Sequence, residues 1–172
     1  MSDLTAAGAH LAPVAYAPGE APEFYWSREL HRRELATGDQ TGDRFALTES
    51  TADAGYASPY HVHHDDDEAI YVLDGVIDLH LGDQVHEGRP GAWFFMPRAV
   101  PHGYVVRRDG PAKMLILTAP AGFDRFFHTY GQPVDAGAPA APAVSREEAE
   151  RVLREEYGIE LLPAPESYPT PW

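Results

Sequence analysis

The feature that most constrains the fold is a series of short strand-like runs in the middle of the 172-residue chain. These runs are rich in Val, Ile, Tyr, Phe and Thr, and turn sequences such as LDG, LGD and EGRPG separate them. Many short strands with little helix between them predict an all-β antiparallel sandwich or barrel and disfavour a parallel sheet. The expected strands cover residues 33–37, 44–51, 56–63, 68–73, 76–81, 84–86, 92–96, 102–106 and 113–118.

The chain divides into three parts by composition. Residues 1–23 are small, contain proline and show no period, so we expect a loose N-terminal arm. Residues 24–131 hold the expected barrel and a flanking short helix in AGFDRFFHTYG. Residues 132–172 contain a Pro/Ala linker, a helix in SREEAERVLREEYG with a capping box and a terminal glycine, and a tail. We expect the apolar stripe of this helix to pack on the outside of the barrel or on a partner subunit.

Charge and composition exclude several classes of function. A net charge of −14 without a basic stripe disfavours nucleic acid and anionic membranes as partners. No apolar run approaches the roughly 20 residues that span a bilayer, and the first residues lack the pattern of a signal peptide. We therefore expect a cytoplasmic protein. The chain has no cysteine, so any metal site must use histidines and carboxylates.

The stretch HVHHDDDE, residues 61–68, predicts a metal site. His61 and His63 are alternate residues of a strand and are expected on one face. In an antiparallel hairpin the residues flanking a short turn lie close, so Glu68 is expected beside both histidines. His102, in PHGYVV, is the best further ligand. The alternative interpretation is a solvated charge run. His64 is interpreted as a surface residue, and the acids at positions 65–67 as turn residues without a further role.

This stretch resembles the first motif of the cupin family, and a second motif follows it. The matching positions are Gly55, His61, His63, Glu68 and Gly75 in the first motif and Gly91, Pro97 and His102 in the second. Ala99 and Val106 depart from the second motif, which usually has glycine and often has asparagine there. The resemblance implies a double-stranded β-helix, or jelly-roll barrel, often dimeric, in which His61, His63, Glu68 and His102 hold one divalent ion. Ni, Fe, Mn, Co and Cu are candidates, and Zn is possible.

A narrower resemblance includes FYW at 24–26, LTAPAGFDRFF and EEYGIELL. The layout is similar to bacterial single-domain cupins of the quercetin 2,3-dioxygenase type. An open metal site needs a mostly apolar pocket. Its candidate residues are Tyr60, the wall residues Phe94, Met96, Tyr104 and Met114, and the lid residues Phe24, Trp26, Phe123 and Phe127. The alternative is that these side chains simply fill the barrel.

Three functions follow as hypotheses. The first is a metal-dependent dioxygenase that cleaves a flavonol or a related hydroxylated aromatic with O2, with Glu68 as the catalytic base and a homodimer as the expected assembly. The second is an oxygen-independent isomerase, cyclase or decarboxylase acting on an aromatic or polyketide-like substrate. The third is a small-molecule-binding protein without catalysis.

Overall fold

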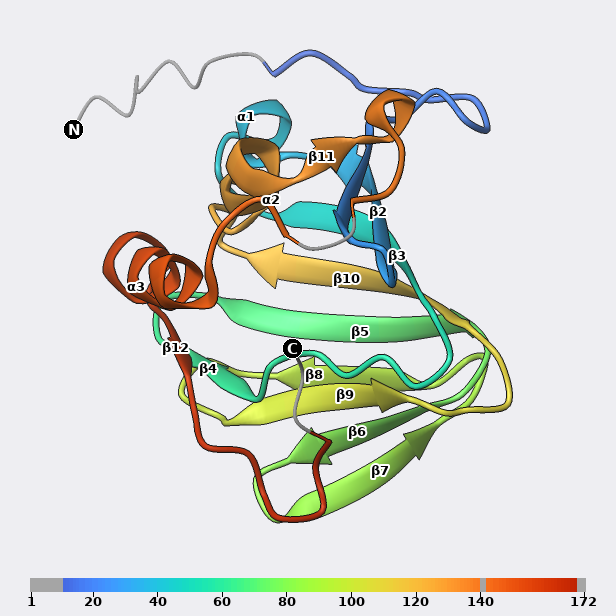
Figure 1. Cartoon of the computed structure of the whole chain (residues 1–172). Coiled ribbons are helices and arrows are strands. Elements are labelled where there is room, and N and C mark those ends of the chain that lie inside the picture. The colour runs from blue at the N-terminus through green and yellow to red at the C-terminus, as the bar shows by residue number, and fades with distance from the viewer. Residues whose placement is uncertain (1–10, 140–141, 170–172) are drawn as a thin grey trace, which may run out of the picture.

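Two antiparallel β-sheets form the body of the molecule (Figure 1), and every strand pair among the described residues is antiparallel. The computed structural model describes residues 11–139 and 142–169. Residues 1–10 of the expected arm, and 140–141 and 170–172 of the expected C-terminal part, lie outside this description. The predicted all-β jelly-roll with short C-terminal helices is confirmed.

One sheet has seven strands and the other has five. The first runs in the spatial order β11 (Gln132–Pro133), β1 (Glu23–Ser27), β2 (Leu30–Ala36), β3 (Ala46–Ala52), β10 (Ala112–Ala119), β5 (Asp67–Asp74) and β8 (Trp93–Met96). The second runs in the order β12 (Ile159–Leu161), β4 (His61–His63), β9 (His102–Val106), β6 (Ile77–Leu81) and β7 (Gln84–Gly88).

Three α-helices and one 3-10 turn complete the described chain: α1 (Gly38–Thr41), α2 (Asp124–Tyr130), η1 (Val134–Ala136) and α3 (Arg146–Tyr157). The side chain of Ser145 caps α3 by accepting from the Glu148 amide, and Gly158 ends it in a left-handed conformation. Among the described residues, no helix is long and apolar enough to cross a membrane.

Alternation of side chains explains why the central strands pack between the sheets. β10 alternates buried and half-buried residues along its whole length, and Met114 and Ile116 point inward with Ile70 and Val72 of the neighbouring β5. Each such side chain, fully buried, contributes roughly 1.5–3 kcal/mol to folding. This apolar layer supports the inner face on which the site is built.

Glycine is required at the tight turn between β5 and β6. Gly75 has φ +74°, and a Cβ placed there would lie 2.2 Å from the Pro111 carbonyl oxygen. A larger residue would force the loop before β10 away from this turn.

Four elements of the fold were not expected from the sequence. α1 replaces part of an expected turn, and β1 is a full strand of the larger sheet. β11 and β12 are short strands beyond the barrel sequence, and each pairs with a segment far from it in the chain. α3 and β12 lie together beside β4 (Figure 1), so the C-terminal segment reaches the strand that carries His61 and His63.

Candidate metal centre

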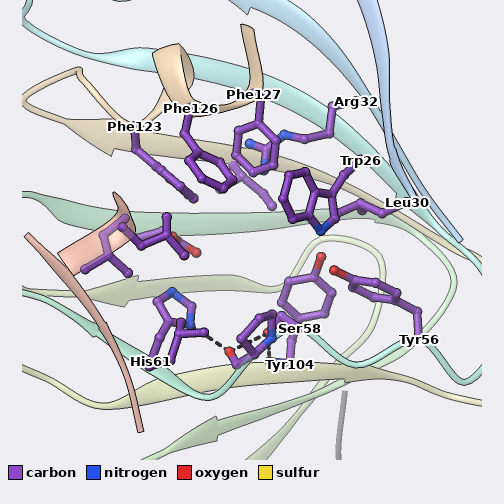
Figure 2. Close-up of a pocket in the computed structure, with 16 residues that line it drawn as sticks. Trp26, Leu30, Arg32, Tyr56, Ser58, His61, Tyr104, Phe123, Phe126 and Phe127 are labelled. Carbon is purple, nitrogen blue, oxygen red and sulfur yellow. Dashed lines mark hydrogen bonds between the residues drawn. The ribbon is translucent and has the colours of Figure 1, made fainter. Parts of the chain in front are cut away.

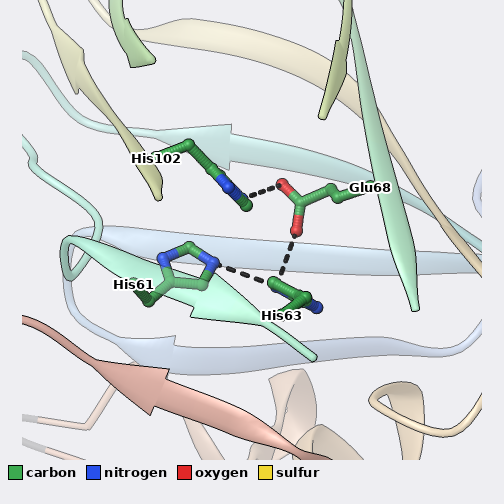
Figure 3. A group of neighbouring side chains, drawn as sticks. All are labelled: His61, His63, Glu68 and His102. Carbon is green, nitrogen blue, oxygen red and sulfur yellow. Dashed lines mark hydrogen bonds and ion pairs between the residues drawn. The ribbon is translucent and has the colours of Figure 1, made fainter. Parts of the chain in front are cut away.

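Four side chains from three strands meet between the two sheets. His61 and His63 lie on β4, Glu68 near the start of β5 and His102 at the start of β9. One ligand atom from each lies within 4.8 Å of the others, and Figure 3 shows the four side chains pointing toward one another. The structure therefore brings together the four residues that the sequence spacing predicted, and as a group they could hold a metal ion.

The expected hairpin, however, is wrong. β4 pairs with β9 and β12, whereas β5 pairs with β10 and β8, so His63 and Glu68 belong to different sheets. Glu68 approaches the histidines across the interior of the sandwich, because the short 64–66 connection carries the chain from one sheet to the other. His61 and His102 are the true cross-strand neighbours.

Each imidazole is anchored through its Nδ1 atom. His61 Nδ1 lies 2.7 Å from the Pro59 carbonyl oxygen and His102 Nδ1 lies 2.8 Å from the Val100 carbonyl oxygen. Since a carbonyl only accepts, each Nδ1 carries the proton and donates it. His63 Nδ1 lies 2.8 Å from a carboxylate oxygen of Asp66 and donates to it. These bonds fix the ring orientations and leave three Nε2 atoms facing inward, as metal-binding histidines require.

The inward Nε2 atoms are placed as ligands for a bound cation. His61 Nε2 and His63 Nε2 are 3.0 Å apart, and His63 Nε2 is 3.3 Å from Glu68 Oε2. His102 Nε2 is buried without a hydrogen-bond partner, 3.9 Å from Glu68 Oε1. Converging lone pairs and an unpartnered buried nitrogen are costly by themselves, and a divalent ion would satisfy all of them. The donor set of three imidazoles and one carboxylate suits a first-row transition metal.

Electrostatics differ among the ligands. Burial, followed by the neighbouring His102 and His63, lowers the pKa of His61 to about 3. Burial acts to lower the pKa of His63 as well, but the Asp66 and Glu68 carboxylates outweigh it and raise that pKa to about 9. Burial acts to raise the pKa of Glu68, yet His102 and His63 hold it well below its usual range. Glu68 is therefore an ionised carboxylate at neutral pH.

The acids between the ligands are more than turn residues, which corrects the sequence interpretation. Asp66 is buried and accepts the Nδ1 proton of His63. Asp67 accepts from both the backbone and the guanidinium of Arg98, in the loop that leads from β8 toward His102. His64 points outward and forms an exposed ion pair with Glu160.

An aromatic pocket opens beside the cluster (Figure 2). Phe123, Phe126 and Phe127, in and just before α2, line one side of it, and Tyr104, Ser58 and His61 line the opposite side. The empty volume is about 660 Å³, a figure that includes open solvent at the mouth of the pocket. Glu68 and His61 belong to its lining, so two of the four side chains of the cluster face the cavity.

Four of the predicted pocket residues line this cavity: Trp26, Tyr104, Phe123 and Phe127. The ring centres of Phe123 and His63 lie 5.7 Å apart in an edge-to-face arrangement, so the pocket wall also contacts a residue of the cluster.

The other five predicted pocket residues lie elsewhere, which corrects that part of the prediction. Met96 and Met114 are fully buried in the core, and Phe94 packs against it beside Gly88. Tyr60 packs on Tyr168 in a separate cluster, and Phe24 stacks on His128. These side chains fill space between or outside the sheets, as the alternative interpretation of the aromatic residues allowed.

Sequence reasoning missed several lining residues: Leu30, Arg32, Tyr56, Ser58, Pro59, Ile116, Phe126, Leu153, Ile159 and Leu161. The alternation of LHRRELA could have indicated Arg32, because it shares the inner face of β2 with Leu30. Leu153 and β12 carried no local signal, because their position depends on pairing between β12 and β4.

Comparison with known proteins agrees with this architecture. Residues 49–118 match the family model described as the cupin domain. This match and the jelly-roll fold together support a single cupin domain. Over 123 residues the chain is 28% identical to quercetin 2,3-dioxygenase of Bacillus subtilis (strain 168), an alignment that covers 72% of the chain. The aligned region spans only 36% of that relative's length.

Solved structures share the cupin fold. KdgF from Halomonas sp. superposes with a TM-score of 0.60 at 19% identity, covering 66% of this chain and 99% of that chain. The polyketide cyclase RemF from Streptomyces resistomycificus superposes with a TM-score of 0.56 at 24% identity, covering 86% of this chain and 97% of that chain. At these identities the likeness shows the fold alone.

Proposed function

We propose that this cupin is a metal-dependent dioxygenase that opens a flavonol or a related hydroxylated aromatic ring with O2. The observation that carries the proposal is the continuity between the His/Glu cluster and an aromatic pocket: Glu68 and His61 line the same cavity as Trp26 and the phenylalanines of α2. The similarity to quercetin 2,3-dioxygenase supports the choice of oxidant and substrate class.

His61, His63, Glu68 and His102 would hold the ion. When bound, a divalent transition metal supplies Lewis acidity toward a substrate hydroxyl and positions open to substrate and O2. The aromatic walls orient the ring of the substrate and exclude water.

Glu68 has the role of proton acceptor. Its carboxylate is ionised and faces the cavity, with Oε2 3.3 Å from His63 Nε2 and Oε1 3.9 Å from His102 Nε2. It takes the proton of the substrate hydroxyl at a carboxylate oxygen, which leaves an electron-rich oxyanion in the ring system that reacts with O2. Both oxygen atoms enter the product, so no external reductant is consumed.

The test is oxygen uptake by the purified, metal-loaded chain with quercetin, followed by absorbance and by electrode. We expect flavonol loss to match O2 consumption and to stop without air. Glu68→Gln should lose turnover by at least a hundredfold, whereas His64→Gln, a histidine change at the exposed neighbouring position, should keep it. Turnover that persists without oxygen would overturn the dioxygenase proposal.

An oxygen-independent reaction is the second candidate. The same ionised Glu68, in a mostly apolar cavity, can abstract a proton for cyclisation or isomerisation without an oxidant. The anaerobic arm uses a polyphenolic polyketide, the substrate class expected for this candidate. If Glu68→Gln keeps ligand binding and neither arm detects turnover in the parent, a binding protein is the remaining candidate.

A further inference from the structure

The inner end of the pocket holds a buried arginine without an anionic partner. Arg32 points inward from β2 and is only 8% exposed. Its Nη2 donates to Thr48 Oγ1 at 2.7 Å, and its Cζ lies 3.8 Å above the Phe127 ring centre. Its Nε is buried without a hydrogen-bond partner. No carboxylate of the described residues forms an ion pair with it, which leaves an always-charged group in an apolar cavity.

Carboxylates attract this charge only across space. Glu68 and Glu34 are the acids whose fields act on Arg32, and Glu34 is already bonded to His128. Neither acid therefore supplies Arg32 with a hydrogen-bonded carboxylate.

Two tyrosine hydroxyls share the pocket with Arg32. Tyr56 and Tyr104 are both buried, their ring centres are 6.0 Å apart, and both line the cavity. Neither hydroxyl has a hydrogen-bond partner among the described residues. A tyrosine hydroxyl is protonated at neutral pH, so both can donate a hydrogen bond. Figure 2 shows the two hydroxyl groups close to Trp26 and away from His61.

This polar end is separated from the metal cluster along the strands. Arg32 lies beside Ser50, Ser50 beside Met114 and Met114 beside Val72, which is four residues beyond Glu68. At the rise of an extended strand, those four residues span about 13 Å. Tyr104 is two residues beyond His102 on β9.

We propose that Arg32, Tyr56 and Tyr104 form a second binding site in the pocket, which takes an anionic oxygen, a phenolate or a carboxylate, on the end of an aromatic ligand remote from the metal cluster. A guanidinium with two hydroxyl donors matches the lone pairs of such an oxygen. The inference rests on the proposed function, which places the reacting end of the substrate at the metal cluster. It deepens that function by naming the substrate class: aromatic molecules with an acidic oxygen at each end.

Equilibrium dialysis of the full, chelator-treated chain tests this site without turnover. The carboxylate arm compares 4-nitrobenzoate with 4-nitrobenzamide, and the phenolate arm compares 4-nitrophenolate at pH 8.5 with 4-nitroanisole. We expect the wild type to prefer at least one anion over its neutral counterpart by at least tenfold, and the arm that shows it identifies the source of the oxygen. Equal affinity within both pairs would overturn the proposal without any variant.

Variants then assign the preference to the residues. Arg32→Met should weaken the preferred anion at least tenfold and leave its neutral counterpart within twofold. The Tyr56→Phe/Tyr104→Phe double variant, which removes only two hydroxyls, should weaken the anion about three- to tenfold. Arg33→Met is the matched control, because Arg33 is the next residue on β2 and pairs outside the pocket with Glu23 and Glu49.

The outcomes separate this inference from the proposed function. An anion preference that survives in both Arg32→Met and the double tyrosine variant would overturn the site. If Arg32→Met does not fold, as judged by its melting curve, the double tyrosine variant and the wild-type comparison still decide. Loss of oxygen uptake with quercetin, by contrast, bears only on the reaction, because the dialysis requires neither metal nor O2.

Discussion

The three imidazoles of the cluster are held by different acceptors. Backbone carbonyls hold His61 and His102, whereas the buried carboxylate of Asp66 holds His63. A carboxylate behind an imidazole fixes the ring and strengthens it as a metal ligand, an effect worth about 10–100-fold in affinity.

We therefore predict that Asp66→Asn lowers metal affinity about 10–100-fold. A competition titration against a chromogenic chelator measures this directly. Asp67→Asn is the control, since it makes the same change one residue along at a half-buried carboxylate paired with Arg98. Equal losses in both variants would show that the effect is a general one of charge.

The pKa of His63 predicts how the metal-free protein responds to pH. Because the folded pKa of about 9 lies above the ordinary value of 6.5, the protonated ring stabilises the fold. That contribution is fully present below pH 6.5 and is lost as the pH rises through 9. His61 acts in the opposite direction. Its folded pKa is about 3, so the unfolded chain binds a proton at this residue more readily, and the fold loses stability as the pH falls below 6.5.

We expect the melting temperature of the metal-free chain to fall by several degrees between pH 7 and pH 10. In His63→Gln this fall should be much smaller, as thermal unfolding followed by circular dichroism will show. A parallel decline in the two proteins would mean that other groups cause it.

The spacing of His61, His63, Glu68 and His102 was sufficient to predict the cluster, because each position is tied to a strand end. The role of Asp66 was not predictable. Three consecutive aspartates look alike in sequence, and only the crossing from one sheet to the other decides which of them is buried.

At the scale of elements, the loop between β8 and β9 is tied to β4 at a strained residue. Ala99 has φ +65°, and its amide donates to the His63 carbonyl oxygen at 2.7 Å. A left-handed conformation costs a residue other than glycine about 1–2 kcal/mol. The sequence resemblance had marked this position as one where glycine is usual, and the backbone conformation gives the reason.

Ala99→Gly should stabilise the protein by about 0.5–1 kcal/mol, after glycine's greater freedom in the unfolded chain is subtracted. Urea unfolding measures the change. Ala36→Gly, at the last strand residue of β2, is the control and should destabilise the protein by up to about 0.5–1 kcal/mol. A loss of stability in Ala99→Gly would contradict the account of this loop.

The central strands were predictable because their period-2 pattern is local. β12 was not, since three residues pair with a strand almost a hundred positions earlier. The apolar stripe of α3 was expected to pack on the outside of the barrel or on a partner subunit, yet Leu153 and β12 line the pocket. Pairing between distant segments, which no local pattern encodes, decided that position.

At the scale of the whole molecule, an apolar patch marks the outer face of the larger sheet. Trp93 and Phe95 on the last strand, β8, are more than half exposed, and Tyr71 lies opposite Trp93 on β5. Exposed aromatics beside an open sheet edge are typical of interfaces. The homodimer expected from the sequence resemblance remains a prediction, and we assign its interface to this patch.

Replacing both Trp93 and Phe95 by serine should convert a dimer into a monomer at micromolar concentration, as sedimentation velocity would report. Val85→Ser, at a similarly exposed apolar residue of the other sheet, should leave the dimer intact. A monomeric wild type would contradict the prediction.

The central claim is that His61, His63, Glu68 and His102 bind one divalent metal ion. The most direct measurement is the metal content of the chain after loading and exhaustive dialysis, determined by elemental analysis alongside a melting curve. The account predicts about one equivalent per chain in the wild type and in His64→Ala, and less than about a tenth of that in a folded His61→Ala/His102→Ala variant. A wild type that retains no ion, or a double variant that retains as much as the wild type, would contradict it.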